Sequence, residues 1–157
     1  MKEIERKFLV TNLPEYVLEC NYSNIIQWYF SKPTDSIENR FRVYLDDKGF
    51  ILEDKCYFDI KIGNGMIRDE IGQKVEYSKF KDILDNYPSI SKKRYRVIKD
   101  DYTIFVDCYE SGLITAEIEV KEDKTEWLIN FVPENWMRED ITGNPKYKNI
   151  TLAYENF

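Results

Sequence analysis

Apolar and polar residues alternate along much of this chain. A period of two is typical of β-strands, because successive side chains of a strand point to opposite faces. The pattern predicts about eight strands joined by short turns. The segments that carry it are residues 1–10, 24–30, 40–44, 50–53, 57–62, 66–75, 92–98, 102–109 and 113–120.

Turn and helix signals complete this outline. Asp46–Gly49 and Gly63–Gly65 are typical of hairpin turns. Helices are few and late: a short amphipathic one at 78–84, and a C-terminal one that begins near residues 144–145. The side chains expected to pack from these two helices are Phe80, Ile83 and Leu84, and then Leu152, Ala153 and Phe157. The pattern therefore predicts a mainly β fold (α+β), an antiparallel barrel or a strongly curved sheet.

Composition narrows the class of protein. The chain has 157 residues, 43% hydrophobic and 15% aromatic, which predicts one folded domain over residues 1–157. No apolar run approaches the ~18 residues of a membrane span, and we expect no signal peptide. The scattered Cys20, Cys56 and Cys108 indicate reduced thiols in the cytoplasm. The 23 basic residues against 29 acidic ones give a net charge of −6, which does not favour a nucleic-acid partner.

The chain contains no histidine. This excludes Ser-His-Asp and Cys-His catalysis, and it excludes metal sites built on imidazole. A metal site would have to use carboxylates, which favour hard cations such as Mg²⁺ or Mn²⁺.

Charged residues recur in sets spaced two apart on the predicted strands, so that each set shares one face. Any one set fits an ordinary solvent-facing surface. Their recurrence opposite core-like apolar faces instead indicates a closed sheet with a charged interior. Mixed charges at close quarters suit a polyphosphate with divalent cations, because arginines grip phosphate oxygens and carboxylates hold the metal. The sets are Glu3, Glu5 and Lys7; Arg40 and Arg42; Asp59 and Lys61; Arg68 and Glu70; Lys92 and Arg94; Glu117 and Glu119.

These sets, in this order, resemble the motifs of the CYTH superfamily, also called triphosphate tunnel metalloenzymes, in its small bacterial form. The opening Glu3-Ile4-Glu5-Arg6-Lys7 resembles the family's Glu-x-Glu-x-Lys signature. The later matches are Gln27 to Phe30, Arg40 to Arg42, Phe58 to Lys61, Arg68 to Glu70, Lys92 to Tyr95, Val106-Asp107, Ala116 to Glu119, Asp140 to Thr142, Tyr147 to Asn149 and Leu152-Ala153. The resemblance covers nearly the whole chain.

The resemblance implies an eight-stranded antiparallel β-barrel whose interior is a charged tunnel, with a few helices packed outside. It implies Mg²⁺ or Mn²⁺ as cofactor, and catalytic roles for Glu5, Lys7, Arg68 and Lys92. The implied phosphate-binding residues are Lys7, Arg40, Arg42, Lys61, Arg68, Lys92 and Arg94. The implied metal ligands are Glu3, Glu5, Glu117 and Glu119, with Asp107 as a metal or water ligand.

Two positions depart from the family pattern. Gly72 stands where a second glutamate often follows Arg-x-Glu, and Phe105 stands where a glutamate commonly precedes the aspartate strand. Neither departure removes a member of the core set.

The expected function is therefore metal-dependent hydrolysis of tripolyphosphate or a related linear triphosphate. The alternatives are cyclisation of ATP, hydrolysis of thiamine or nucleoside triphosphates, and non-catalytic binding of polyphosphate or nucleotide. We expect a small-molecule triphosphate as the partner and neither nucleic acid nor membrane. Small members of the family are often dimers, which leaves a homodimer open.

Overall fold

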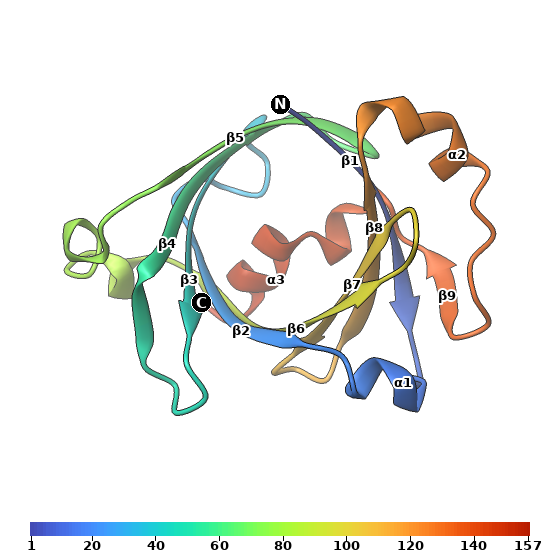
Figure 1. The fold of residues 1–157 in the computed structure, drawn as a ribbon. Helices are drawn as coiled ribbons and strands as arrows, with labels where there is room; N and C mark the ends of the chain where they lie inside the picture. Colours follow the sequence, from blue (N-terminus) through green and yellow to red (C-terminus); the bar gives the residue numbers. More distant parts are fainter.

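A computed structural model describes all of residues 1–157 and shows eight antiparallel strands closed into a ring (Figure 1). The order around the ring is β5-β4-β3-β2-β6-β7-β8-β1, and β1 pairs again with β5. The predicted antiparallel ring is confirmed. Its strands are β1 (Lys2–Val10), β2 (Tyr22–Tyr29), β3 (Ile37–Leu45), β4 (Ile51–Ile62), β5 (Ile67–Lys74), β6 (Ser89–Ile98), β7 (Thr103–Tyr109) and β8 (Ile114–Val120).

The first strand closes the ring because it has partners on both sides. Residues 4–9 of β1 pair with β8, and residues 2–4 pair with β5. The other end of the same edge pairs with β9 (Met137–Asp140), a ninth strand that the sequence pattern does not predict. Closure leaves few unpaired edges, which limits edge-to-edge association.

The main hydrophobic core lies on the outer face of the ring. One cluster contains Ile4, Phe8, Val106 and Ile118, and α1 (Glu15–Leu18) and α2 (Thr125–Ile129) cover it. A second cluster surrounds Phe41, Val43, Cys56 and Leu84, and it is covered by residues 75–87. In place of the predicted helix at 78–84, this cover has two 3₁₀ turns, Tyr77–Lys79 and Leu84–Asn86, separated by a turn that leaves Ile83 exposed.

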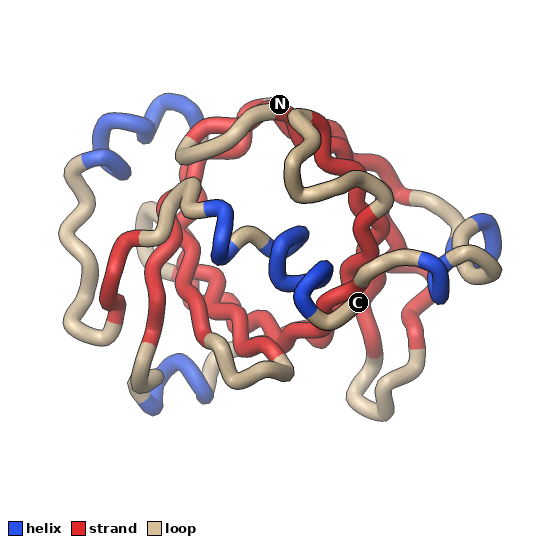
Figure 2. The backbone as a smooth tube through the Cα atoms, turned by 180° about the vertical axis from the view of Figure 1, so that it is seen from behind, coloured by secondary structure: helices blue, strands red, loops and turns tan.

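The C-terminal helix α3 (Asn149–Glu155) lies across one end of the ring rather than outside it (Figures 1 and 2). Its Ile150 and Ala153 pack on Tyr29, Ile90 and Tyr109, which point into the ring. The prediction of helices packed outside therefore holds for α1 and α2 but is wrong for α3. The reason is that Tyr29, Ile90 and Tyr109 form an apolar surface on the inner face at this end, and this surface buries an apolar face of the helix.

Several boundaries also differ from the sequence pattern. Residues 50–53 and 57–62 form one continuous strand, β4. The C-terminal segment begins with the 3₁₀ turn Pro145–Tyr147, and Phe157, predicted to pack, is 69% exposed. No helix of the structure combines the length and the apolar character that crossing a membrane requires.

Candidate active site

The inner face of the ring surrounds a cavity of about 590 Å³, within the usual range for small-molecule sites. Ring residues and the segment 141–149 line it. Arg96, Lys55, Tyr44, Tyr57 and Phe105 line it on the strand ends away from α3. The predicted residues Glu3, Glu5, Lys7, Arg40, Arg42, Lys61, Arg68, Arg94, Glu117 and Glu119 all line this cavity.

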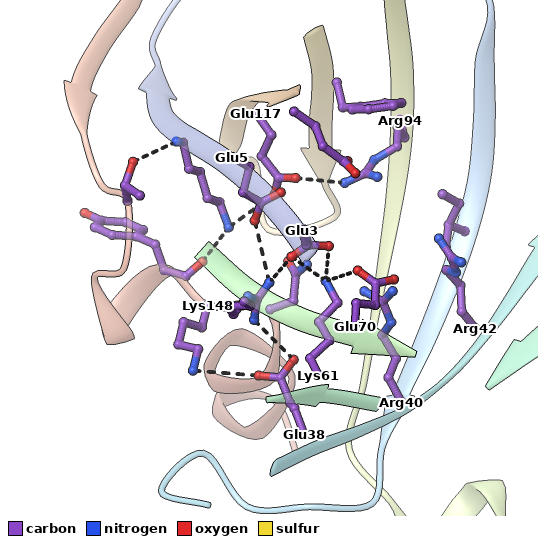
Figure 3. A pocket seen from close by; sticks show the side chains of 18 of the residues that line it. Glu3, Glu5, Glu38, Arg40, Arg42, Lys61, Glu70, Arg94, Glu117 and Lys148 are labelled. Atoms are coloured by element: carbon purple, nitrogen blue, oxygen red, sulfur yellow. Dashed lines mark hydrogen bonds and ion pairs between the residues drawn. The ribbon is translucent and has the colours of Figure 1, made fainter. Parts of the chain in front are cut away.

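Glu3 is the most heavily paired acid on β1. Its carboxylate lies 3.0 Å from Nζ of Lys61 and 2.7 Å from Nη2 of Arg68 (Figure 3). Burial alone would raise the pKa of Glu3, but Lys61 and Arg68 outweigh it and hold the pKa well below its usual range. Glu70 lies nearby, 3.9 Å from Lys61, and burial together with Glu3 raises the pKa of Glu70 to about 7.

Glu5, Glu117 and Glu119 form an acidic wall on two neighbouring strands. Glu5 lies directly opposite Glu119 in the β1–β8 register, and Glu117 is two residues away on β8. The nearest cation to Glu5 is Arg68, whose Nη2 lies 3.6 Å from its carboxylate. Burial and the neighbouring Glu117 and Glu3 raise the pKa of Glu5 well above its usual range. The charged form of Glu5 is therefore unfavourable unless a further cation lies beside it.

Asp107 anchors two cations on β6. Its carboxylate lies 3.0 Å from Nζ of Lys92 and 2.7 Å from Nε of Arg94. The side chains of Lys92 and Asp107 are only 1% and 0% exposed, so they lie behind the cavity surface. Arg94 does reach the cavity and also contacts Glu117 at 3.4 Å, with its guanidinium over the ring of Phe105. Both oxygens of Asp107 thus accept hydrogen bonds from Lys92 and Arg94, and its predicted role as a metal or water ligand stays a prediction.

Arg40 and Arg42 line the opposite side of the cavity on β3, and Asp59 of β4 lies between them. One oxygen of Asp59 accepts hydrogen bonds from Nε and Nη2 of Arg40 at 3.0 and 2.8 Å, and lies 3.4 Å from Nη2 of Arg42. The guanidinium of Arg42 also lies over the rings of Tyr44 and Tyr57. Its Nε is buried without a hydrogen-bond partner.

The C-terminal segment adds polar groups that the sequence analysis did not assign to the site. Lys7 donates from Nζ to the backbone carbonyl of Tyr147 at 2.8 Å and lies 3.8 Å from Glu117. Lys148 reaches Glu38 at 3.8 Å, and Glu38 in turn lies 3.8 Å from Nη1 of Arg68 (Figure 3). The sequence did carry a signal for Glu38, because it lies two residues before Arg40 and so shares its face of the strand.

The donor chemistry of the acidic wall fits a hard divalent cation. Glu5, Glu117 and Glu119 offer oxygen ligands only, and the one cation close to Glu5, Arg68, is shared with Glu3. Glu3 is committed to Lys61 and Arg68. No three acidic or thiol side chains of the chain already converge on one point, so the wall supplies suitable ligands rather than a finished cage.

Comparisons with known proteins agree with this geometry. A curated inorganic triphosphatase of Nitrosomonas europaea is 31% identical over 98% of this chain and 97% of its own length. A crystal structure of an inorganic triphosphatase superimposes with a TM-score of 0.63 at 28% identity, over 96% of this chain and 93% of that one. A putative adenylate cyclase from Vibrio parahaemolyticus shares the fold, with a TM-score of 0.54 at 15% identity over 81% and 84% of the two chains. No family model matches the chain.

Proposed function

The chain belongs to the family of the inorganic triphosphatase from Nitrosomonas europaea, and from this premise we propose that it hydrolyses inorganic tripolyphosphate or a related linear triphosphate with Mg²⁺ or Mn²⁺. We also place it in the CYTH superfamily on its motifs. The observation that carries the proposal is the lining of the cavity, which brings Arg40, Arg42 and Arg94 together with the carboxylates of Glu5, Glu117 and Glu119 on β1 and β8.

The cations bind and orient the phosphates in this proposal. Arginines take phosphate oxygens through paired N–H groups, and Arg42 has a buried Nε with no partner in the protein. Lys7 and Arg68 approach from β1 and β5, beside the acids. In the transition state of phosphoryl transfer, charge spreads over the oxygens of the transferred group, and fixed cations stabilise it there.

Glu5, Glu117 and Glu119 would hold the metal ion, for which their oxygen ligands and their closeness on neighbouring strands are suited. When bound, a divalent cation neutralises phosphate charge and lowers the pKa of a coordinated water. Overall, water adds to a terminal phosphorus, the bond from that phosphorus to its bridging oxygen breaks, and tripolyphosphate yields diphosphate and phosphate. Lys61 and Arg68 fix the orientation of Glu3 at the edge of the acidic wall.

The test is phosphate release from tripolyphosphate with Mg²⁺ or Mn²⁺, by wild type and Glu5→Gln. We expect the variant to lose about 100-fold or more in kcat, because an uncharged amide is a poor ligand for a hard cation. The matched control is Glu139→Gln, an exposed glutamate on β9 outside the cavity, which should retain wild-type rates. Full activity in Glu5→Gln would contradict the proposed role of the acidic wall, and no release by wild type would contradict hydrolysis.

A second candidate is turnover of an organic triphosphate, by hydrolysis or cyclisation. The observation in its favour is aromatic: the cavity is lined by Tyr44, Tyr57 and Phe105, which an inorganic chain does not need. The same assay with ATP and thiamine triphosphate, together with detection of cyclic AMP, separates these reactions. Tight binding of tripolyphosphate without any turnover would identify a binding protein. The cytoplasmic location and a homodimer stay predictions.

A further inference from the structure

Gly72 occupies an unusual place for a glycine. The chain's other glycines all adopt positive φ angles in turns, whereas Gly72 lies within β5 and does not. Glycine weakens a strand interior, and its presence there often marks the close approach of another group. The reason for this glycine is therefore space rather than backbone conformation.

The group that uses this space is the carboxylate of Asp59. Asp59 lies directly opposite Gly72 in the β4–β5 register, and both residues face the cavity side. A Cβ added at Gly72 would lie 2.5 Å from Oδ1 of Asp59, which is far inside van der Waals contact. The carboxylate thus bends over the glycine, and no other residue at position 72 leaves it there.

From that position Asp59 accepts hydrogen bonds from Arg40 and forms an ion pair with Arg42. It is 2% exposed, and its second oxygen, Oδ2, takes both close contacts from Arg40 and the 3.4 Å contact from Arg42. Two guanidiniums on the same face of one strand repel each other, and the shared carboxylate of Asp59 offsets part of that repulsion. Arg42 keeps its unpartnered Nε and its stacking on Tyr44 and Tyr57.

We propose that Asp59 is a positioning residue of the phosphate site: it fixes Arg40 and Arg42 as a paired clamp and, as a resident anion, limits how tightly that clamp holds a polyphosphate. The absence of a side chain at Gly72 leaves the space that the carboxylate of Asp59 occupies. This inference rests on the proposed function, because the clamp is assigned to phosphate. The resident charge matters for turnover, since tighter ground-state binding lowers KM without raising kcat and slows the release of products.

The first experiment compares wild type with Asp59→Asn, which keeps the shape and one acceptor but removes the charge. We expect KM for tripolyphosphate, and Kd measured by calorimetry without added metal, to fall about tenfold, while kcat does not rise. Inhibition by the product diphosphate should strengthen in parallel. The matched control is Asp69→Asn on β5, an exposed aspartate paired with Lys2, which should match wild type.

The second experiment tests the gap. Gly72→Ala keeps the charge but pushes the carboxylate away from its position, so that KM should rise about tenfold as Arg40 loses its orientation. In a chain that already carries Asp59→Ala, the same substitution should change KM by less than about twofold, because the colliding atoms are gone.

The outcomes separate the two proposals. If wild type hydrolyses tripolyphosphate but Asp59→Asn leaves Kd, KM and diphosphate inhibition unchanged, Asp59 is only structural and this inference is wrong, while the proposed function stands. If wild type binds tripolyphosphate without turnover, the proposed function fails and the calorimetric comparison still decides the inference. Absence of binding by wild type would overturn both.

Discussion

The two faces of the same strands differ in what they contribute. On β3, Arg40 and Arg42 point into the cavity while Phe41 between them is fully buried in the outer core. On β8, Glu117 faces inward and Ile118 outward in the same way. A ring built like this keeps its hydrophobic core outside and its chemistry inside. Neighbouring residues in the sequence therefore divide stability and function between them.

Phe41→Ala should show the largest effect, and on stability alone. Phe41 is completely buried and stacks on Phe80, with ring centroids 4.4 Å apart. Its truncation should lower the free energy of unfolding by about 3–5 kcal/mol, measured by urea denaturation. At temperatures where the variant is still folded, KM should match wild type. A changed KM with unchanged stability would break the division between the two faces.

Arg42→Met, one residue away, should lower activity and leave stability unchanged. The substitution removes a guanidinium that lies at the cavity with an unpartnered Nε, and it keeps an unbranched side chain against Tyr44 and Tyr57. We expect kcat/KM for tripolyphosphate to fall about 30-fold, which corresponds to about 2 kcal/mol. The urea midpoint should stay close to that of wild type. Loss of stability without loss of kcat/KM would assign Arg42 to the core instead.

The smallest expected effect is on the pH dependence of stability, which should reflect the shifted pKa values of carboxylates on the inner face. Between pH 4.5 and about 7 the folded state binds a proton at Glu70 that the unfolded state does not, so stability rises as pH falls through this range. The slope is at most about 1.4 kcal/mol per pH unit for one group. Asp107 acts in reverse: burial would raise its pKa, but Arg94 and Lys92 depress it, and its contribution is lost as pH falls below 3.8.

The measurement is the free energy of urea unfolding from pH 8 to pH 3. Wild type should be most stable near pH 5, and Glu70→Gln should reduce the slope between pH 5 and pH 7, to which the raised pKa of Glu5 also contributes. A slope that Glu70→Gln leaves intact would show that another group is responsible.

The sequence predicted most of the ring because a period of two fixes which side chains face inward once the sheet is closed. That rule placed Glu3 with Glu5 and Arg40 with Arg42 correctly on the cavity side. It did not predict β9 or α1, since four-residue elements carry too little periodicity.

Partnerships between distant segments lay beyond the sequence pattern. Nothing in the spacing of Glu38 and Lys148 indicates that they meet, because their contact depends on how the C-terminal segment folds back. Gly72 was visible as a departure from the family pattern, but its reason lies on β4, in the carboxylate of Asp59. The depth of Lys92, behind the cavity surface, likewise follows from packing around Asp107.

The helix across one end of the ring also limits how substrate and products can enter and leave the cavity. Ile150 and Ala153 of α3 form an apolar seal against inward-facing Tyr29 and Tyr109. Because α3 covers that end of the ring, we expect a linear chain to enter, and its fragments to leave, at the opposite end. We expect such a chamber to favour attack on terminal anhydride bonds over cleavage along the length of a threaded polymer.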